Sequence, residues 1–168
     1  MCSSDLVRSL RRRGVRVRIL PHASGPADLL SSDVDGIVFS PGPGDPARLE
    51  AQVGLARAAI ADGRPVLGIC LGHQVIGRAA GAETRRLRFG HHGANHPVKD
   101  LATGKVEITS MNHGFAVDPA SLPKNAEETH RSLFDGSNCG LRLKDKPVFS
   151  VQYHPEASPG PQIGRAHV

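Results

Sequence analysis

The segment Pro65-Val-Leu-Gly-Ile-Cys-Leu-Gly-His-Gln74 joins a short apolar run to a sharp corner. Val66 to Ile69 predict a buried strand, and a helix is expected to begin near Gly72. Between them lies Gly68-Ile-Cys-Leu-Gly72, a G-x-C-x-G pattern that is the cysteine version of the nucleophile elbow. Its glycines leave room for a tight turn, and the N-terminus of the following helix favours the thiolate form of a cysteine. By itself the pattern is equally compatible with a nucleophilic Cys70 and with a buried structural cysteine.

The composition restricts the class of protein. The chain has 168 residues, enough for one α/β domain with a sizeable core. The net charge is +5, but one tyrosine, no tryptophan and no alternation of basic and aromatic residues disfavour a nucleic-acid partner. No apolar run approaches the roughly 20 residues of a membrane span, and no signal peptide opens the chain. Three cysteines provide no disulfide framework, so we expect a reducing, cytoplasmic location.

Both ends of the chain look foreign to the rest of the sequence. Met1-Cys-Ser-Ser-Asp-Leu6 and Ile163-Gly-Arg-Ala-His-Val168 resemble translated sequencing-adapter sequence, which is left out of fold reasoning. We therefore expect one domain over residues 7–162, truncated at both ends.

The first half of the chain alternates between strand and helix patterns. Before the segment around Cys70 we expect a helix tail, an alternating strand, an apolar strand of the fully buried kind and a helix. These elements are Val7–Arg13 closed by Gly14, Val15–Leu20, Gly36–Ser40, and Ala47–Ala61 stopped by Gly63. Such alternation predicts a parallel βαβ core.

After Gly81 the pattern changes to short alternating segments separated by turn residues. We expect two hairpins and a final buried strand, with a loop at Gly90–Pro97. The expected strands are Glu83–Phe89, Val98–Leu101, Lys105–Thr109, Phe115–Val117, Glu127–Leu133, Cys139–Leu143 and Pro147–Gln152. The fold class predicted is α/β, with a mostly parallel open sheet flanked by helices and an antiparallel hairpin region.

Unusual loops follow three of the buried strands, and in an open parallel sheet ligands bind beyond the carboxyl ends of the strands. Pro41-Gly-Pro-Gly-Asp-Pro46 can offer backbone N–H groups to an oxyanion, although taken alone a simple Pro-Gly turn is the favoured interpretation. After the last strand, His154 and Glu156 lie on one face of an extended segment. There a carboxylate can orient an imidazole, which can take a proton from Cys70, as in a catalytic triad.

The other histidines and cysteines give weaker evidence for a functional site. His91, His92 and His96 match no zinc-site spacing, so we expect no metal. Cys139 lies in a predicted hairpin without a basic partner and is expected to pack in the core.

Taken together, the three loops resemble those of class I (triad) glutamine amidotransferase domains, over nearly all of residues 7–162. The general signatures are Ser40–Pro46, Gly68–Gln74 and His154–Glu156. Within this family the chain most resembles the C-terminal domain of carbamoyl-phosphate synthase small subunits. That closer resemblance is carried by Gly93-Ala-Asn-His-Pro-Val98, Asn112-His-Gly-Phe-Ala-Val-Asp118 and Glu156-Ala-Ser-Pro-Gly-Pro161.

The resemblance implies a flavodoxin-like three-layer fold and a glutamine-hydrolysing activity. Cys70 would attack the side-chain amide of glutamine, His154 would act as general base and then acid, and Glu156 would orient His154. A γ-glutamyl thioester would form and be hydrolysed. The positions implied to bind glutamine or its oxyanion are Gly42, Gly44, Leu71, Gln74, Asn112, Gly114 and Phe115.

The resemblance also implies a partner. Ammonia would pass to a large synthetase subunit that makes carbamoyl phosphate from bicarbonate and ATP for the arginine and pyrimidine pathways. ATP and magnesium would bind to that subunit, and this chain would carry no cofactor. Other interpretations stay open: another class I amidotransferase or a γ-glutamyl hydrolase, a non-catalytic regulatory domain, or an inactive fragment. Gly93–Val98 argues against another amidotransferase or a hydrolase, and the intact set of Cys70, His154 and Glu156 argues against a non-catalytic domain.

Two departures from the family pattern have expected consequences. Met111 stands where the family commonly has glutamine, and we expect a modest effect. The resemblance also implies that an N-terminal domain, a first strand before Val7 and a helix after Gln162 are absent from this chain. We therefore expect a marginally stable or aggregation-prone chain.

Overall fold

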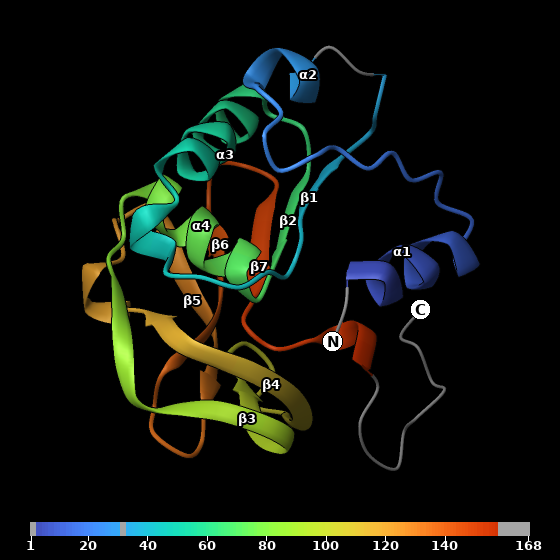
Figure 1. Cartoon of the computed structure of the whole chain (residues 1–168). Coiled ribbons are helices and arrows are strands. Elements are labelled where there is room, and N and C mark those ends of the chain that lie inside the picture. Colours follow the sequence, from blue (N-terminus) through green and yellow to red (C-terminus); the bar gives the residue numbers. More distant parts are fainter. Residues whose placement is uncertain (1–2, 31–32, 158–168) are drawn as a thin grey trace.

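The sheet has seven strands in the order β1-β2-β7-β6-β5-β3-β4 and is open (Figure 1). This computed structural model describes residues 3–30 and 33–157. The strands are β1 Ile37–Phe39, β2 Val66–Ile69, β3 Thr84–Asp100, β4 Val106–Val117, β5 Ala126–Ser132, β6 Asn138–Leu143 and β7 Val148–Val151. The α-helices are α1 Ser3–Arg12, α2 Pro26–Leu30, α3 Glu50–Asp62 and α4 Leu71–Ala80. Short 3-10 helices are η1 Pro46–Arg48, η2 Pro119–Ser121 and η3 Pro155–Ala157.

Strands β1, β2 and β7 form the parallel part of the sheet. The other four neighbouring pairs are antiparallel and contain both predicted hairpins. The predicted α/β class, with an open sheet, helices and a hairpin region, is therefore confirmed. The prediction that the sheet is mostly parallel is wrong, because only two of its neighbouring pairs are parallel and the sheet is mixed.

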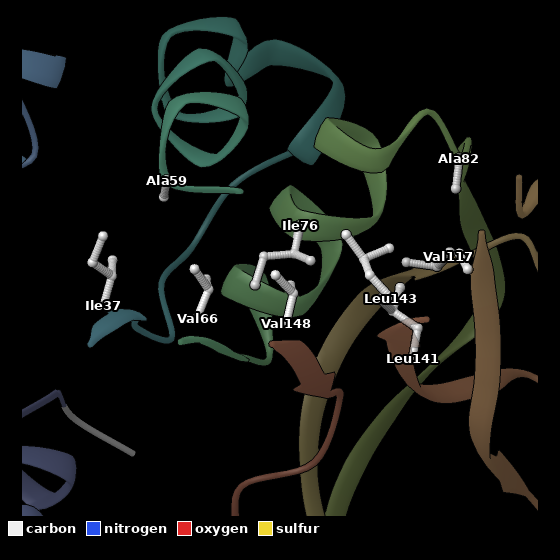
Figure 2. Packing of buried hydrophobic residues seen from close by; sticks show 10 residues of the cluster. Ile37, Ala59, Val66, Ile76, Ala82, Val117, Leu141, Leu143 and Val148 are labelled. Carbon is white, nitrogen blue, oxygen red and sulfur yellow. The ribbon is translucent and has the colours of Figure 1, made fainter. Parts of the chain in front are cut away.

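Helices α3 and α4 cover one face of the parallel strands, where Ile37, Val66 and Val148 pack beneath Ile76 (Figure 2). Apolar residues face the helices because the strand period of two places alternate side chains on one side of the sheet. On the other side lies α1 (Figure 1), whose Leu6 is buried against Ile69 and Cys70. Strand β2, which ends directly before Cys70, is thus packed between helices.

Helix α1 is longer than the predicted tail at Val7–Arg13, because it begins at Ser3. It therefore crosses the expected boundary between residues 6 and 7. The other expected foreign segment, residues 163–168, lies outside the described residues, and the domain limits 7–162 stay a prediction. None of the helices in residues 3–30 and 33–157 is long and apolar enough to cross a membrane.

The predicted strand Val15–Leu20 is wrong, because this segment has no regular secondary structure. Val15 and Ile19 are 46% and 68% exposed. A strand is stable only when its backbone N–H and C=O groups pair with those of a neighbouring strand. Alternation of apolar and basic residues is compatible with a strand, but it does not show that such a neighbouring strand exists. No strand in the described residues pairs with this segment.

The predicted loop Gly90–Pro97 is also wrong, because these residues lie inside β3, paired with β4. The pairing is irregular on both sides of His91–Gly93, between Arg86 and His91 and again between Gly93 and His96. Glycine within a strand often marks such a bulge. The glycines of this segment were interpreted as loop residues, whereas they lie at irregular positions of a strand. The short strand expected at Phe115–Val117 is likewise the end of the longer β4.

The helix predicted at Ala47–Ala61 is divided. Its first turn is the 3-10 helix η1, in which the Asp45 carboxylate accepts a hydrogen bond from the Ala47 N–H at 2.9 Å. Helix α3 follows and ends at Gly63, whose φ of 89° is readily adopted only by glycine, as predicted. Strand β1 was expected to be buried on both faces. It is buried on one face only, because Val38 is 39% exposed.

Candidate active site

Cys70 stands at a strained corner between β2 and α4. Its φ is 54°, and it is the only residue other than glycine with positive φ among those described. A Cβ atom on Gly72 would lie 2.0 Å from the Phe39 carbonyl oxygen, and one on Gly68 would lie 2.7 Å from the Gly72 oxygen. The G-x-C-x-G pattern is therefore a steric requirement, and the strained cysteine is a feature typical of functional sites.

A cavity of about 820 Å³ opens at this corner. It is bounded by the loop after β1, the first turn of α4, the middle of β4 and the segment after β7. The predicted site residues that line it are Gly42, Gly44, Cys70, Leu71, Gln74, Asn112, Gly114, Phe115 and His154. The structure thus brings the three predicted loops together, and Glu156 lies behind His154. The binding role of each residue stays a prediction.

The loop after β1 forms one rim of the cavity. Gly44 has a φ of 114°, which disfavours any other residue there. Gly42 is close to the elbow, since a Cβ atom on it would lie 3.0 Å from the Leu71 side chain. Glycine at both positions lets the backbone approach a ligand closely, as an oxyanion site requires.

His154 and Glu156 form a buried pair. The His154 Nδ1–H donates to Glu156 Oε1 at 2.9 Å, and the two side chains are only 4% and 2% exposed. With Nδ1 so engaged, Nε2 remains for the Cys70 thiol. Burial opposes protonation of the imidazole, but its contacts with Cys70 and Glu156 outweigh burial and raise the pKa of His154 to about 9. The arrangement couples a thiol, a proton acceptor and an orienting carboxylate.

The side-chain amide of Gln74 is hydrogen-bonded to other residues of the protein at the cavity wall. Its Nε2 donates to the Phe115 backbone oxygen at 2.7 Å and to Gln152 Oε1 at 3.0 Å. The His113 Nδ1–H donates to the same Phe115 oxygen at 2.7 Å. Because both Nε2 hydrogens are used within the protein, the Gln74 carbonyl is the group left for a ligand.

Six cavity-lining residues were not predicted as site residues. Three lie in the loop after β1, and the others come from β3 and β4; they are Pro41, Pro43, Asp45, Arg86, His92 and His113. His113 lies within the quoted segment Asn112–Asp118 and could have been found from that position. Arg86 and His92 come from the N-terminal half of β3, whose pairing with β4 was not predicted.

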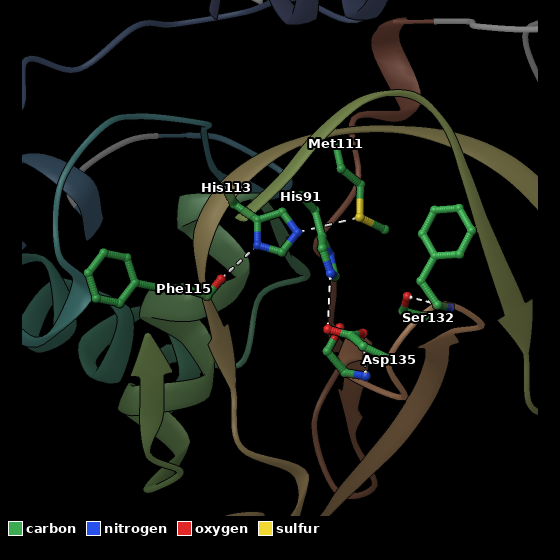
Figure 3. Close-up of polar contacts among 8 residues, drawn as sticks. His91, Met111, His113, Phe115, Ser132 and Asp135 are labelled. Atoms are coloured by element: carbon green, nitrogen blue, oxygen red, sulfur yellow. Dashed lines mark hydrogen bonds and ion pairs between the residues drawn. The ribbon is translucent and has the colours of Figure 1, made fainter. Parts of the chain in front are cut away.

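The His113 ring packs against the ring of His91 (Figure 3), which in turn packs against the ring of His96. The His91 ring centroid lies 4.9 Å from that of His113 and 5.1 Å from that of His96. The Asp135 carboxylate is 3.1 Å from His91 Nε2. Burial is the main cause that lowers the pKa of His113 to about 4, with the neighbouring histidines adding to it. Among the described residues, no group of three metal-binding side chains is placed to hold an ion.

Met111 and Cys139 are core residues. Met111 is buried beside Val98 and Cys139, and its sulfur contacts His113 Nε2 at 3.4 Å. Burial raises the pKa of the Cys139 thiol to about 12. The prediction that Cys139 serves packing is confirmed, since it stays a buried thiol.

Comparison with known proteins identifies a family. The family model of glutamine amidotransferase class-I matches residues 2–166. The carbamoyl phosphate synthase small chain of Bradyrhizobium diazoefficiens is 58% identical over 159 residues, which are 94% of this chain and 40% of that protein. The small chain of Ruegeria pomeroyi is also 58% identical, over 160 residues, 94% of this chain and 41% of that protein. The chain therefore spans about two fifths of the length of these relatives.

Solved structures share the fold. A glutamine amidotransferase from Methylobacillus flagellatus has a TM-score of 0.72 at 20% identity, covering 90% of this chain and 64% of that one. A glutamine amidotransferase from Thermotoga maritima has a TM-score of 0.67 at 19% identity, covering 92% and 69%. At these identities the likeness extends to the arrangement of strands and helices alone.

Proposed function

The chain belongs to the class I glutamine amidotransferase family, and from that premise we propose that it is the glutamine-hydrolysing part of a carbamoyl-phosphate synthase. It would release ammonia from L-glutamine and pass it to a large synthetase subunit. The observation that carries the proposal is the strained Cys70 in a cavity with the His154–Glu156 pair, joined by a 2.9 Å hydrogen bond. This is the nucleophile, base and orienter that acyl transfer needs.

In the proposed reaction, the proton of the Cys70 thiol passes to His154 Nε2 first, and Cys70 Sγ then attacks the side-chain carbonyl carbon of glutamine. The raised pKa of His154, about 9, supports this step, because the imidazolium keeps that proton at neutral pH. His154 then gives the proton to the departing amide nitrogen, and ammonia leaves a γ-glutamyl thioester. Water attacks the thioester with His154 as base, and glutamate and the Cys70 thiol are regenerated.

Backbone N–H groups would stabilise the oxyanion formed in both steps. The candidates are those of Leu71, at the head of α4, and of the loop around Gly42 and Gly44, which line the cavity beside Cys70. Donors fixed in this way cost no reorganisation when charge develops, and each is worth about 10²-fold or more in rate.

The partner proposed is the large subunit, where ATP, magnesium and bicarbonate would bind. The names of the relatives, which are small chains of carbamoyl phosphate synthase, support this division. The arginine and pyrimidine pathways would use the product. Cys70 and Cys139 are both free, which supports the proposed reducing, cytoplasmic location.

Glutamate release from L-glutamine tests the proposal. The assay uses this chain and a chimera in which it replaces the matching segment of the Bradyrhizobium diazoefficiens small chain, each with and without the large chain of that organism. We expect Cys70→Ser to lower release by at least about 10³-fold, whereas Cys139→Ala, which alters a buried thiol that does not line the cavity, leaves it within about twofold once folding is verified. Release that is undiminished in Cys70→Ser would remove the mechanism. Faster cleavage of γ-glutamyl peptides than of glutamine would favour a hydrolase instead.

A further inference from the structure

His92 contacts a residue of the candidate glutamine site directly. Its Nδ1 lies 2.7 Å from Oδ1 of Asn112. The two residues are register partners on the antiparallel strands β3 and β4, and both line the cavity that contains Cys70. This hydrogen bond therefore joins two residues of the cavity wall that a bound substrate would contact.

The local backbone brings His92 to this place. Residues 91–93 are the only part of β3 in register with β4 between its two irregular stretches. Bulges of this kind bend a strand and redirect side chains. Gly90 leaves space for the imidazole, since a Cβ atom there would lie 2.5 Å from His92 Nε2. The exposed His92 ring therefore lies over Gly90 and against Asn112.

The bond decides which end of the Asn112 amide faces the cavity. An asparagine amide carries an acceptor, Oδ1, and a donor, Nδ2, and can present either after rotating by about 180°. When His92 Nδ1–H donates to Oδ1, both Nδ2 hydrogens remain for a ligand. A wall that offers donors suits a carbonyl or carboxylate oxygen, and the reversed amide would place an acceptor against that oxygen.

We propose that His92 is a positioning residue that holds the Asn112 side chain with Nδ2 toward the cavity, so that the site accepts an oxygen of the substrate. This inference rests on the proposed glutamine hydrolysis. Asn112 also accepts a contact from Cys70 Sγ at 3.8 Å, but through its backbone oxygen. Loss of His92 should therefore weaken substrate binding while leaving the chemistry at Cys70 largely intact.

Steady-state kinetics of His92 variants in the chimera described above test this. His92→Ala should raise KM for glutamine about five- to tenfold, the usual effect of one lost hydrogen bond, with kcat changed less than about twofold. His92→Asn places an amide N–H near the position of Nδ1 and should restore most of the affinity. His22→Ala is the matched control, because His22 is an exposed histidine 2.9 Å from the side-chain amide of Gln52 and neither lines the cavity.

A double-mutant cycle separates positioning from a direct or structural role. In an Asn112→Ala background, His92→Ala should cause no further rise in KM. A KM equal to wild type in His92→Ala, failure of His92→Asn to rescue, or a full additional rise in the Asn112→Ala background would each overturn the inference.

A binding measurement distinguishes this inference from the proposed reaction. Calorimetric titration of L-glutamine into Cys70→Ser, with and without His92→Ala, reports affinity without turnover. A five- to tenfold weaker Kd in the double variant supports the role of His92 even if the unmodified protein hydrolyses nothing, in which case only the reaction is refuted. Equal affinities, or no binding in either variant, overturn the positioning role.

Discussion

Gly72, in the first turn of α4, lies directly against the backbone of Phe39 at the end of β1, with no room for a methyl group between them. Helix α4 therefore begins in contact with a strand that is adjacent to β2 in the sheet. This contact explains the sharp corner at Cys70, because the first turn of α4 packs closely against the ends of the parallel strands β1 and β2.

Gly72→Ala should displace α4 and lower the free energy of unfolding by about 3 kcal/mol or more, the range of severe overpacking. Gly54→Ala is the control, because Gly54 lies in α3 with nothing within 4 Å of the added Cβ atom. That change should stabilise by about 0.5–1 kcal/mol through helix propensity. Urea denaturation of both variants is the measurement, and equal effects would contradict the steric role of Gly72.

The pKa of His154 should depend on its two partners. NMR titration of the wild-type protein should give a value of about 9. Cys70→Ala and Glu156→Gln should each lower it, because burial alone lowers the pKa and these contacts are what raise it. A pKa that stays near 9 in both variants would show that neither contact controls the proton on His154.

Stability should be greatest near neutral pH. Burial lowers the pKa of His73 to about 3 and that of His113 to about 4. Between these values and about 6.5 the unfolded chain binds protons that the folded chain does not, so the free energy of unfolding falls as pH drops, by up to about 1.4 kcal/mol per pH unit for each group. For His154 the sign is opposite, and stability falls as pH rises from about 6.5 to 9.

Urea denaturation between pH 4.5 and 9 measures both limbs of this profile. His113→Asn should flatten the acid limb and His154→Asn the alkaline limb. A profile that is flat over this range, or limbs unaffected by these changes, would contradict the assignment.

The face of the sheet that carries α1 has an exposed apolar row. Val38, Leu67 and Phe149 are register partners on β1, β2 and β7, and Phe149 is 53% exposed. Phe149→Thr should reduce aggregation, measured by light scattering, while changing the free energy of unfolding by less than about 1 kcal/mol. Val148→Thr, on the buried face, should instead destabilise by about 1–3 kcal/mol, because it buries a hydroxyl group. Unchanged scattering in Phe149→Thr would mean that another surface drives association.

Sequence patterns were sufficient wherever a local rule determines the structure. The bounds of β2, the corner at Cys70 and the end of α3 at Gly63 follow from apolar runs and glycine placement, and the structure has all three. The approach of His154 to Cys70 was also expected, because the carboxyl ends of adjacent parallel strands lie at one edge of a sheet.

Features that depend on pairing between distant segments could not be obtained in this way. Val15–Leu20 has the alternation of a strand but pairs with no described strand, and Gly90–Pro97 has the composition of a loop but pairs with β4. The position of His92 opposite Asn112 depends on two bulges in β3, and no local pattern sets that register.

The contrast between the two described cysteines allows the folded fraction of a preparation to be counted. Cys139 is fully buried with a pKa near 12, whereas Cys70 lines an open cavity. On the proposed mechanism, an electrophilic glutamine analogue should attach to Cys70 once per folded molecule, with Cys2, which lies outside the described residues, replaced by serine. Because attachment requires an intact corner, its stoichiometry is an active-site titration that reports molecules with a correctly formed site rather than total protein.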